Sequence, residues 1–217
     1  MNIQACIFDL DGVIVDTAKY HYQAWRKLAN SLGFDFTEVE NEQLKGVSRM
    51  ESLEIILSIG KKTLDDAAKQ ALATQKNDWY LEHIAAMTPN EILPGVIYFL
   101  DELKAKNIRI ALGSASKNAV LTLEKVNLLN YFELIIDGTK TTRSKPDPQV
   151  FQLGAKGLGI APENCIVFED AAKGVTAARS AGMYAIGIGN AHDLTHAHAV
   201  ISSFEHINFR RIVELLN

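Results

Sequence analysis

The amino-acid sequence predicts a parallel α/β fold that is interrupted by one all-helical segment. Short apolar runs, typical of buried strands, alternate with segments of helical hydrophobic period, which is the pattern of a parallel sheet with helices on both faces. The alternation stops between residues 17 and 88, where only helical periods occur. A chain of 217 residues is long enough for such a core together with a small inserted domain.

The first predicted strand covers residues 3–8 and ends in Asp-Leu-Asp-Gly. A run this short and this apolar is typical of a strand that is buried on both faces. Similar runs predict five further strands, at residues 108–113, 134–137, 165–168, 184–188 and 199–201. Helical periods lie between most of these runs, for example over residues 96–103 and 150–158.

The inserted segment contains apolar residues at helical spacing and no convincing strand. Tyr20, Ala24 and Leu28 share one helix face, and a long helix is expected over residues 64–86. We therefore expect a helical cap domain at residues 17–88. The α/β core domain would then consist of residues 1–16 and 89–217.

Composition and charge exclude several classes of protein. The sequence holds 22 Lys and Arg against 26 Asp and Glu, a net charge of −4, and no run of five basic residues, so no nucleic-acid partner is expected. Cys6 and Cys165 lie inside apolar runs, which indicates buried thiols in a reducing compartment. No signal-peptide core precedes Asp9 and no stretch is long enough to span a membrane, so we expect a cytoplasmic protein without a membrane partner.

Carboxylates follow two of the predicted strands. Asp9 and Asp11 come at the end of the first strand, and Glu169-Asp170 follows the run at residues 165–168. If these strands are neighbours, four carboxylates meet at one sheet edge, where a pair at about 4 Å repels by about 4 kcal/mol in an effective dielectric of about 20. Mg²⁺ would relieve this repulsion. The alternative for the first pair is a solvated Asp-Gly turn.

Hydroxyl and cationic groups complete the pattern. The segment Ser114-Ala115-Ser116-Lys117-Asn118 follows the strand at residues 108–113 and is expected to open a helix, so it forms a candidate phosphate cradle. Lys145 precedes Pro146-Asp147-Pro148, a rigid turn before another helix. Taken singly, Ser114 could be only a helix cap and Lys145 only a surface lysine.

In order along the chain, these segments resemble the four motifs of the haloacid dehalogenase-like phosphotransferases. The resemblance implies a Rossmann-like core with a helical cap inserted after the first motif. It also implies that Asp9 is the nucleophile, which forms an aspartyl-phosphate, and that Asp11 is the general acid and base. The transferring phosphoryl group would be held by Ser114, Ala115 and Lys145, and Mg²⁺ by Asp9, the backbone carbonyl of Asp11, Glu169 and Asp170.

The inserted segment is similar to the cap of the sugar phosphomutases in this family. The similarity concerns Thr17, His21, Lys45, Gly46, Val47, Ser48, Arg49, Ser52 and Lys76. It implies that β-glucose 1-phosphate is converted to glucose 6-phosphate through a 1,6-bisphosphate, with glucose 1,6-bisphosphate as activating phosphoryl donor. Because that intermediate carries two phosphates, a second phosphate site is needed, and Arg49 would form it with Ser116, Lys117 and Asn118. We expect a monomer.

Several alternatives remain open at this point. The same core chemistry gives a Mg²⁺-dependent sugar-phosphate phosphatase if water attacks the aspartyl-phosphate, and the fold could also serve a non-catalytic sugar-phosphate-binding protein. Lys45 and Arg49 could lie in a solvated charged loop, and His21 could be an interface or capping histidine. One residue departs from the family pattern: Lys173 stands where a small residue is common.

Overall fold

The computed structural model describes residues 1–217 and contains one six-stranded, fully parallel sheet with the order β3-β2-β1-β4-β5-β6. The strands are β1 (Ala5–Phe8), β2 (Arg109–Gly113), β3 (Leu134–Ile136), β4 (Cys165–Glu169), β5 (Tyr184–Ile188) and β6 (Ala199–Ile201). All six predicted strands are present, with ends that differ by at most two residues. The predicted parallel α/β fold is therefore confirmed.

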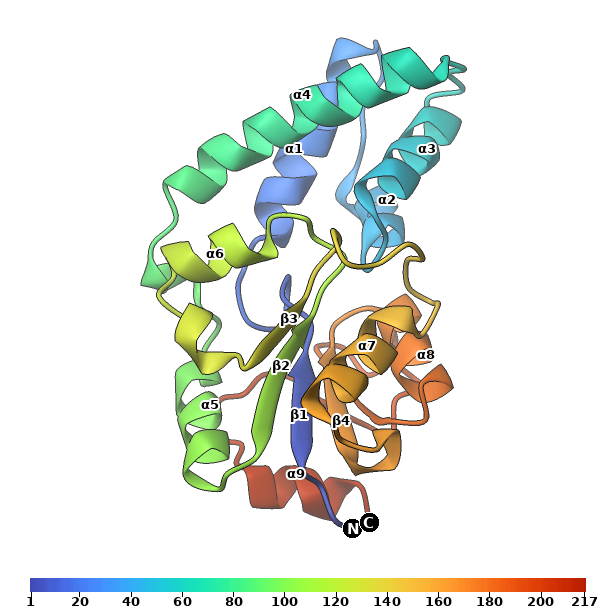
Figure 1. Cartoon of the computed structure of the whole chain (residues 1–217). Helices are drawn as coiled ribbons and strands as arrows, with labels where there is room; N and C mark the ends of the chain where they lie inside the picture. The colour runs from blue at the N-terminus through green and yellow to red at the C-terminus, as the bar shows by residue number, and fades with distance from the viewer.

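Helices cover both faces of this sheet, as Figure 1 shows. One face carries α5 (Val96–Ala105), α6 (Ala119–Lys125) and α9 (Phe209–Leu215), and the other carries α7 (Gln149–Leu158) and α8 (Ala172–Ser180). Three short 3₁₀ helices, η2 (Pro89–Glu91), η3 (Leu129–Tyr131) and η4 (Pro162–Asn164), lie in the connections. Both chain termini lie at the foot of the core, opposite the inserted helices (Figure 1).

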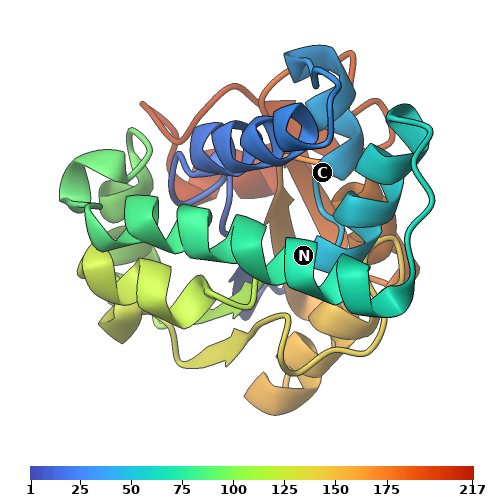
Figure 2. The same ribbon diagram turned by 90° about the horizontal axis from the view of Figure 1, so that it is seen from above.

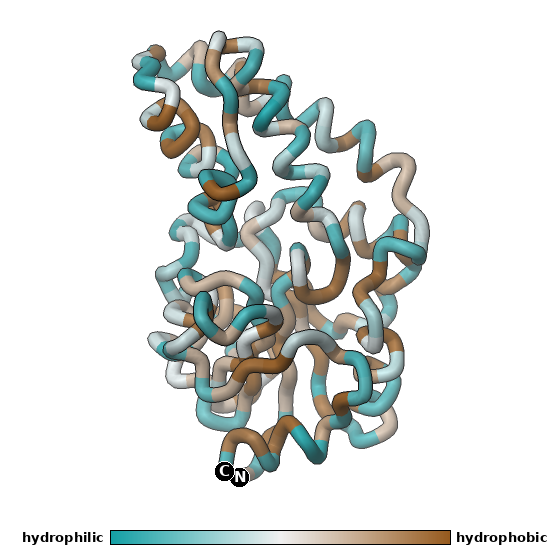
Figure 3. The backbone as a smooth tube through the Cα atoms, turned by 180° about the vertical axis from the view of Figure 1, so that it is seen from behind, coloured by the Kyte–Doolittle hydropathy of each residue, from teal (hydrophilic) through white to brown (hydrophobic).

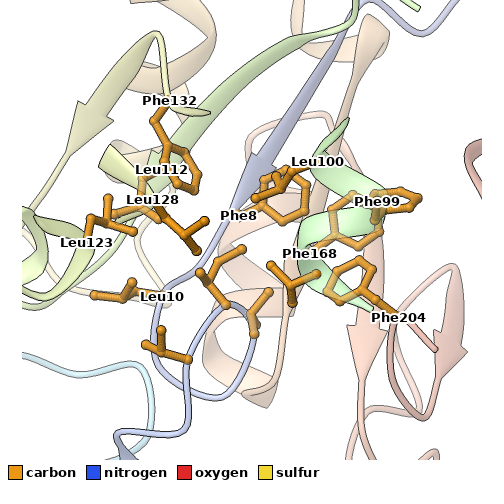
Figure 4. Close-up of a cluster of buried hydrophobic side chains, with 14 of the residues drawn as sticks. Phe8, Leu10, Phe99, Leu100, Leu112, Leu123, Leu128, Phe132, Phe168 and Phe204 are labelled. Atoms are coloured by element: carbon orange, nitrogen blue, oxygen red, sulfur yellow. The ribbon is translucent and has the colours of Figure 1, made fainter. Parts of the chain in front are cut away.

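The central strand supplies side chains to both helical layers. Phe8 of β1 stacks on Phe168 of β4 with ring centroids 4.8 Å apart, and Phe99 and Phe204 complete an aromatic cluster on this face (Figure 4). Ile7 points to the opposite face, because successive side chains of a strand alternate. The end of β1, and with it the first carboxylate motif, is thus fixed by packing on two sides.

The inserted segment forms a helical layer above the carboxyl ends of the strands (Figure 1). It consists of α1 (Ala18–Ser31), α2 (Glu38–Asn41), the 3₁₀ helix η1 (Glu42–Leu44), α3 (Arg49–Ile59) and α4 (Asp66–Ala85), which we call the cap helices. They share a hydrophobic cluster of their own, which includes Leu28, Phe36 and Leu53. Figure 2 shows α4 crossing the top of the molecule beside α1.

Two linkers connect the cap helices to the core, and they run side by side. Val15 and Ile92 form an antiparallel bridge, the Asp16 N–H donates to the Glu91 carbonyl at 2.9 Å, and the Leu93 N–H donates to the Ile14 carbonyl at 3.0 Å.

Along the cap helices hydrophilic and hydrophobic positions alternate, as expected for helices that bury one side (Figure 3). None of the helices combines the length and apolar character that a membrane span requires.

Candidate active site

A pocket of about 100 Å³ lies between the cap helices and the carboxyl ends of the strands. This is the position at which open α/β sheets bind ligands, because β1 lies where the strand order reverses. The pocket brings together all of the predicted site residues except four: Thr17, Ser48, Lys145 and Glu169 do not line it.

The floor of the pocket is built around a buried ion pair. Asp9 follows β1 directly, and its Oδ1 accepts a hydrogen bond from Lys145 Nζ at 2.5 Å, while the same ammonium also donates to Glu169 Oε1. Burial lowers the pKa of Lys145, but the Asp9 and Glu169 carboxylates outweigh burial and hold that pKa above its usual value. The lysine therefore stays charged and fixes Asp9 from below.

The second acidic pair divides between two environments. Glu169 ends β4 and is fully buried, where its Oε2 accepts the Ala171 N–H at 2.9 Å. A Cβ at residue 174 would collide with this carboxylate, so Gly174 allows Glu169 to lie beneath α8. Burial raises the pKa of Glu169 to about 7. Asp170, by contrast, faces the pocket, and its nearest cation is Lys45 Nζ at 3.9 Å.

These residues fit a hard divalent cation. The Asp170 carboxylate accepts no hydrogen bond from a protein group, and burial followed by the charges of Glu169 and Asp9 raises its pKa well above the usual range. The backbone carbonyl of Asp11 accepts no backbone hydrogen bond. Because the Lys145 ammonium lies between Asp9 and Glu169, no three acidic, histidine or cysteine side chains form a ready ligand cluster. The available donors are nevertheless the oxygens that Mg²⁺ prefers.

Asp11 has the environment of a proton carrier. Its Oδ1 accepts a hydrogen bond from the Thr17 hydroxyl and lies 3.9 Å from His21 Nε2. Burial, and then the negative charge of Asp9, raise the pKa of Asp11 to about 6. A carboxyl with such a pKa can both donate and accept a proton near neutral pH. Thr17 does not line the pocket, but its hydroxyl hydrogen-bonds Asp11 from the first linker, behind the pocket wall.

Two cations on the cap side of the pocket, Lys76 and Arg49, lack carboxylate partners. His21 Nδ1 and Lys76 Nζ are 2.8 Å apart, and Lys76 lies over the rings of Trp25 and Tyr80, at 4.5 and 4.9 Å. Burial, followed by the charge of Arg49, lowers the pKa of Lys76 to about 7. An anion in the pocket would favour the charged form of this lysine.

Arg49 faces a turn of the core across the pocket. It is the first residue of α3, whose N-terminus is fixed by a capping box between Ser48 and Glu51. On the core side, the Asn118 side-chain amide donates to Asn77 Oδ1 of α4 at 2.9 Å and joins core to cap. Ser116 and Lys117 line the same pocket.

The predicted phosphate cradle is a turn that leads into a helix. As the sequence predicts, residues 114–118 directly precede α6, which begins at Ala119 and has Asn118 at its N-cap. The Ser114 hydroxyl accepts the N–H of Ser116 at 3.0 Å, and the Ser116 hydroxyl accepts the N–H of Asn118 at 3.2 Å. Such local bonds compete with helix formation, so residues 114–118 form a turn instead.

The pocket also contains residues that sequence reasoning did not assign to it. Ala18, Asn41 and Leu44 form part of the wall, and so does Trp25. Trp25 packs inside the cap helices, but it also covers Lys76. The available signal was helical spacing, because residues 21 and 25 are one turn apart on α1 and share a face.

Comparison with known proteins gives concordant results. A family model described as haloacid dehalogenase-like hydrolase matches residues 3–182. The β-phosphoglucomutase of Bacillus subtilis is 42% identical over 201 residues, covering 92% of this chain and 89% of that protein. A phosphorylated carbohydrates phosphatase of Thermotoga maritima is 32% identical over 208 residues, covering 93% and 91%. The crystal structure of a Clostridium difficile β-phosphoglucomutase has a TM-score of 0.96 at 46% identity, covering 99% and 97% of the two chains.

Proposed function

The chain belongs to the haloacid dehalogenase-like hydrolase family, and from this premise we propose that it is a β-phosphoglucomutase. It interconverts β-D-glucose 1-phosphate and glucose 6-phosphate through an aspartyl-phosphate and a β-glucose 1,6-bisphosphate intermediate. Sequence identities of 42% and 46% with two β-phosphoglucomutases, over nearly the whole chain, support this reaction.

One observation carries the proposal: a single pocket holds two groups of anion-binding side chains. Ser114, Ala115, Arg49 and Lys117 all line the pocket that contains Asp9, and we assign the first two to the phosphoryl group that is transferred and the last two to a second phosphate. Hydrolysis of a monophosphate needs only the first of these groups. A sugar bisphosphate needs both, because one phosphate is transferred while the other is held.

In the proposed mechanism Asp9 attacks the phosphorus atom of one phosphate of the bound β-glucose 1,6-bisphosphate and becomes an aspartyl-phosphate. Asp11 gives its proton to the leaving sugar oxygen, which becomes a hydroxyl. In the second half, Asp11 removes a proton from the hydroxyl of the accepting sugar, and that oxygen takes the phosphoryl group from Asp9. Lys145 offsets negative charge beside Asp9 in both halves.

The cofactor of this reaction would be Mg²⁺, in keeping with the donor set at the sheet edge. The side chains of Asp9, Glu169 and Asp170 and the backbone carbonyl of Asp11 would hold it. When bound, the cation would offset the negative charge that builds up on the phosphoryl group. Glucose 1,6-bisphosphate would be the activating donor, because an unmodified Asp9 must receive a phosphoryl group before it can pass one to the C6 hydroxyl of β-glucose 1-phosphate.

The intermediate must turn end for end between the two halves of the reaction, so the pocket has to open. We infer that residues 17–88 move as a cap domain against a core of residues 1–16 and 89–217. The paired linkers that carry Val15 and Ile92 support a hinge at this place. Closure would exclude water from the aspartyl-phosphate.

The setting of the enzyme is also part of the proposal. We expect a monomer in the cytoplasm that acts on a small sugar phosphate. Cys6 and Cys165 are both free and buried, which is consistent with a reducing compartment.

A phosphatase is the second candidate, favoured by the Thermotoga maritima relative, which is a phosphorylated carbohydrates phosphatase. In that reaction water would take the phosphoryl group from Asp9. The core residues would keep the same roles, and the second phosphate site would serve only to select substrates.

One assay separates the two candidates. The protein is incubated with β-glucose 1-phosphate, Mg²⁺ and a catalytic amount of β-glucose 1,6-bisphosphate, and the products are followed by phosphorus NMR. A mutase gives glucose 6-phosphate as the main product. Free phosphate without glucose 6-phosphate would contradict the mutase proposal and support the phosphatase. Fructose 6-phosphate is a suitable control substrate, because it shares the phosphate but lacks an anomeric phosphate ester.

A further inference from the structure

Lys173 departs from the family pattern, and it reaches from the core to the cap helices. It lies in the first turn of α8, three residues after Asp170, and its side chain is half-buried. Lys173 Nζ donates to the backbone carbonyl of Gln43 in η1 at 3.4 Å. A core side chain thus holds the short helix that leads into the cap loop at residues 45–48.

The charge of the same ammonium acts on a second cap group. Glu51, in the first turn of α3, accepts hydrogen bonds from the Ser48 N–H at 3.1 Å and from the Ser48 hydroxyl at 3.0 Å. Burial raises the pKa of Glu51, but the Ser144 hydroxyl, the bonds from Ser48 and the charge of Lys173 together lower it below the usual value. Lys173 therefore contacts η1 before the cap loop, and its charge also lowers the pKa of Glu51 after the loop.

The cap loop itself lies directly on α8. A Cβ at Gly46 would be 3.5 Å from Ala171 Cβ and 3.7 Å from Lys145 Cδ, which are ordinary contact distances. Lys45 and Val47 of the same loop line the pocket. Any group that holds this loop against α8 therefore also holds the wall of the active site in place.

Lys173 differs from the polar contacts between cap and core that lie at the pocket. Lys45 with Asp170, Asn77 with Asn118 and Thr17 with Asp11 all involve residues that face the ligands or the reacting carboxylates. Their partners change when substrate and cation enter. Lys173 lines no part of the pocket, so its contact can persist through the reaction.

We propose that Lys173 is a closure latch: a positioning residue whose ammonium ties α8 to the carbonyl of Gln43 and to Glu51 and so stabilises the closed cap without touching substrate. The latch itself does not depend on which reaction the site performs, whereas its kinetic consequences rest on the proposed function. A partly exposed charge contact of this kind is modest, and it corresponds to an effect of about two- to fivefold on the closed-to-open ratio.

The direct test measures cap opening in the ligand-free protein. Because both native cysteines are buried, thiols introduced by Ser58→Cys on α3 and Gln152→Cys on α7 can carry a fluorophore pair. Lys173→Met should raise the open-to-closed ratio by about two- to fivefold at low salt, with little effect near 1 M salt, where the charge is screened. Lys173→Arg should restore closure, and Lys156→Met, on α7, should leave the ratio unchanged.

A second variant separates charge from helix capping. Glu51→Gln keeps a side chain that can complete the capping box with Ser48, but it removes the negative charge. In a double-mutant cycle Lys173→Met should then add little to Glu51→Gln. If Lys173→Met closes like the wild type at low salt, or if the two effects simply add, the latch is refuted.

The kinetic arm uses the mutase assay. Lys173→Met should raise KM by about two- to fivefold and change kcat less, since the ammonium does not touch the reacting groups. An unchanged KM alongside a shifted opening ratio would contradict the kinetic role and leave the latch standing. Absence of mutase turnover in the wild type would instead overturn the proposed function, while the fluorescence result still decides the latch.

Discussion

The core wall and the cap wall of the pocket differ in whether their buried cations have carboxylate partners. On the core wall the Lys145 ammonium is bonded to the Asp9 and Glu169 carboxylates, so each charge has a partner before any ligand binds. On the cap wall Lys76 and Arg49 form no ion pair. The core wall thus holds its charged groups in place before substrate binds, whereas Lys76 and Arg49 of the cap wall gain a counter-charge only from an incoming phosphate.

This difference has a structural origin. The core wall consists of strand ends that are fixed by packing on both faces of the sheet, as the cluster around Phe8 and Phe168 shows (Figure 4). The cap wall belongs to helices with a separate hydrophobic cluster and two linkers. A rigid wall can hold a nucleophile in place, and a wall that opens can admit and reorient a sugar bisphosphate.

Removal of the nucleophile on the core wall should have the largest effect. Asp9→Asn is expected to abolish both glucose 6-phosphate formation and phosphate release, because no aspartyl-phosphate can form. Turnover is measured with the mutase assay and with a phosphate-release assay. Asp101→Asn, which changes an exposed carboxylate bonded only to the Tyr131 hydroxyl, is the matched control and should stay active. Residual release of phosphate by Asp9→Asn would show that another group attacks the substrate.

Loss of a cap cation should separate the two reactions. Arg49→Ala is expected to lower mutase kcat/KM by about 10- to 100-fold, because a charged hydrogen-bonding partner of the second phosphate is lost. Hydrolysis of a small monophosphate should fall much less, since it needs only the core wall. Lys62→Ala, at an exposed lysine beyond α3, should leave both rates unchanged. Equal losses of both activities in Arg49→Ala would argue against a separate second site.

The unpaired state of Lys76 should be visible in stability against pH. The pKa of Lys76 is about 7 in the folded protein, against an ordinary value of 10.5. Between these values the unfolded chain binds a proton that the folded protein lacks, so the free energy of unfolding should rise with pH, by about 1 kcal/mol per pH unit.

Lys76→Met removes this dependence. Urea unfolding between pH 7 and 10 should therefore show a flatter profile for the variant than for the wild type, and the variant should be the more stable of the two at pH 7. Identical slopes for the two proteins would mean that Lys76 keeps its proton in the folded state.

The smallest effect is expected at Tyr80, which packs against His21 in the same wall. Its buried hydroxyl has no hydrogen-bond partner, so Tyr80→Phe should change stability by only about 0 to 1 kcal/mol, and in the stabilising direction. Tyr20→Phe is the matched control, since Tyr20 donates to Glu91 at 2.8 Å and its loss should destabilise. A clear loss of stability in Tyr80→Phe, measured by urea unfolding, would reveal a partner for this hydroxyl.

Sequence reasoning was most successful where one physical constraint dominates. A strand buried on both faces must be apolar throughout, and for this reason all six strands could be identified from short apolar runs. The carboxylates could be placed because parallel strands end at one edge, and Asp9 and Asp170 do meet there.

Contacts between residues far apart in the sequence could not be predicted. The ion pair of Lys145 with Glu169 joins residues 24 apart, and the contact of His21 with Lys76 joins residues 55 apart, so neither produces a local pattern. The turn at residues 114–118 precedes α6 as expected, but the bonds from backbone N–H groups to the hydroxyls of Ser114 and Ser116 that shape it were not predicted. Trp25 was not singled out as a site residue in the sequence, although it belongs both to the cap cluster and to the pocket wall.

The most direct test of the account follows the phosphoryl group itself from Asp9 to its acceptor. The enzyme is given β-glucose 1,6-bisphosphate with a radioactive phosphate, together with excess unlabelled β-glucose 1-phosphate and Mg²⁺, and the label is traced in the products. If the cap excludes water and presents a sugar hydroxyl to the aspartyl-phosphate, the label passes into the sugar bisphosphate and glucose 6-phosphate pools. Label that accumulates in free phosphate at the rate of turnover would contradict the account and identify the enzyme as a phosphatase.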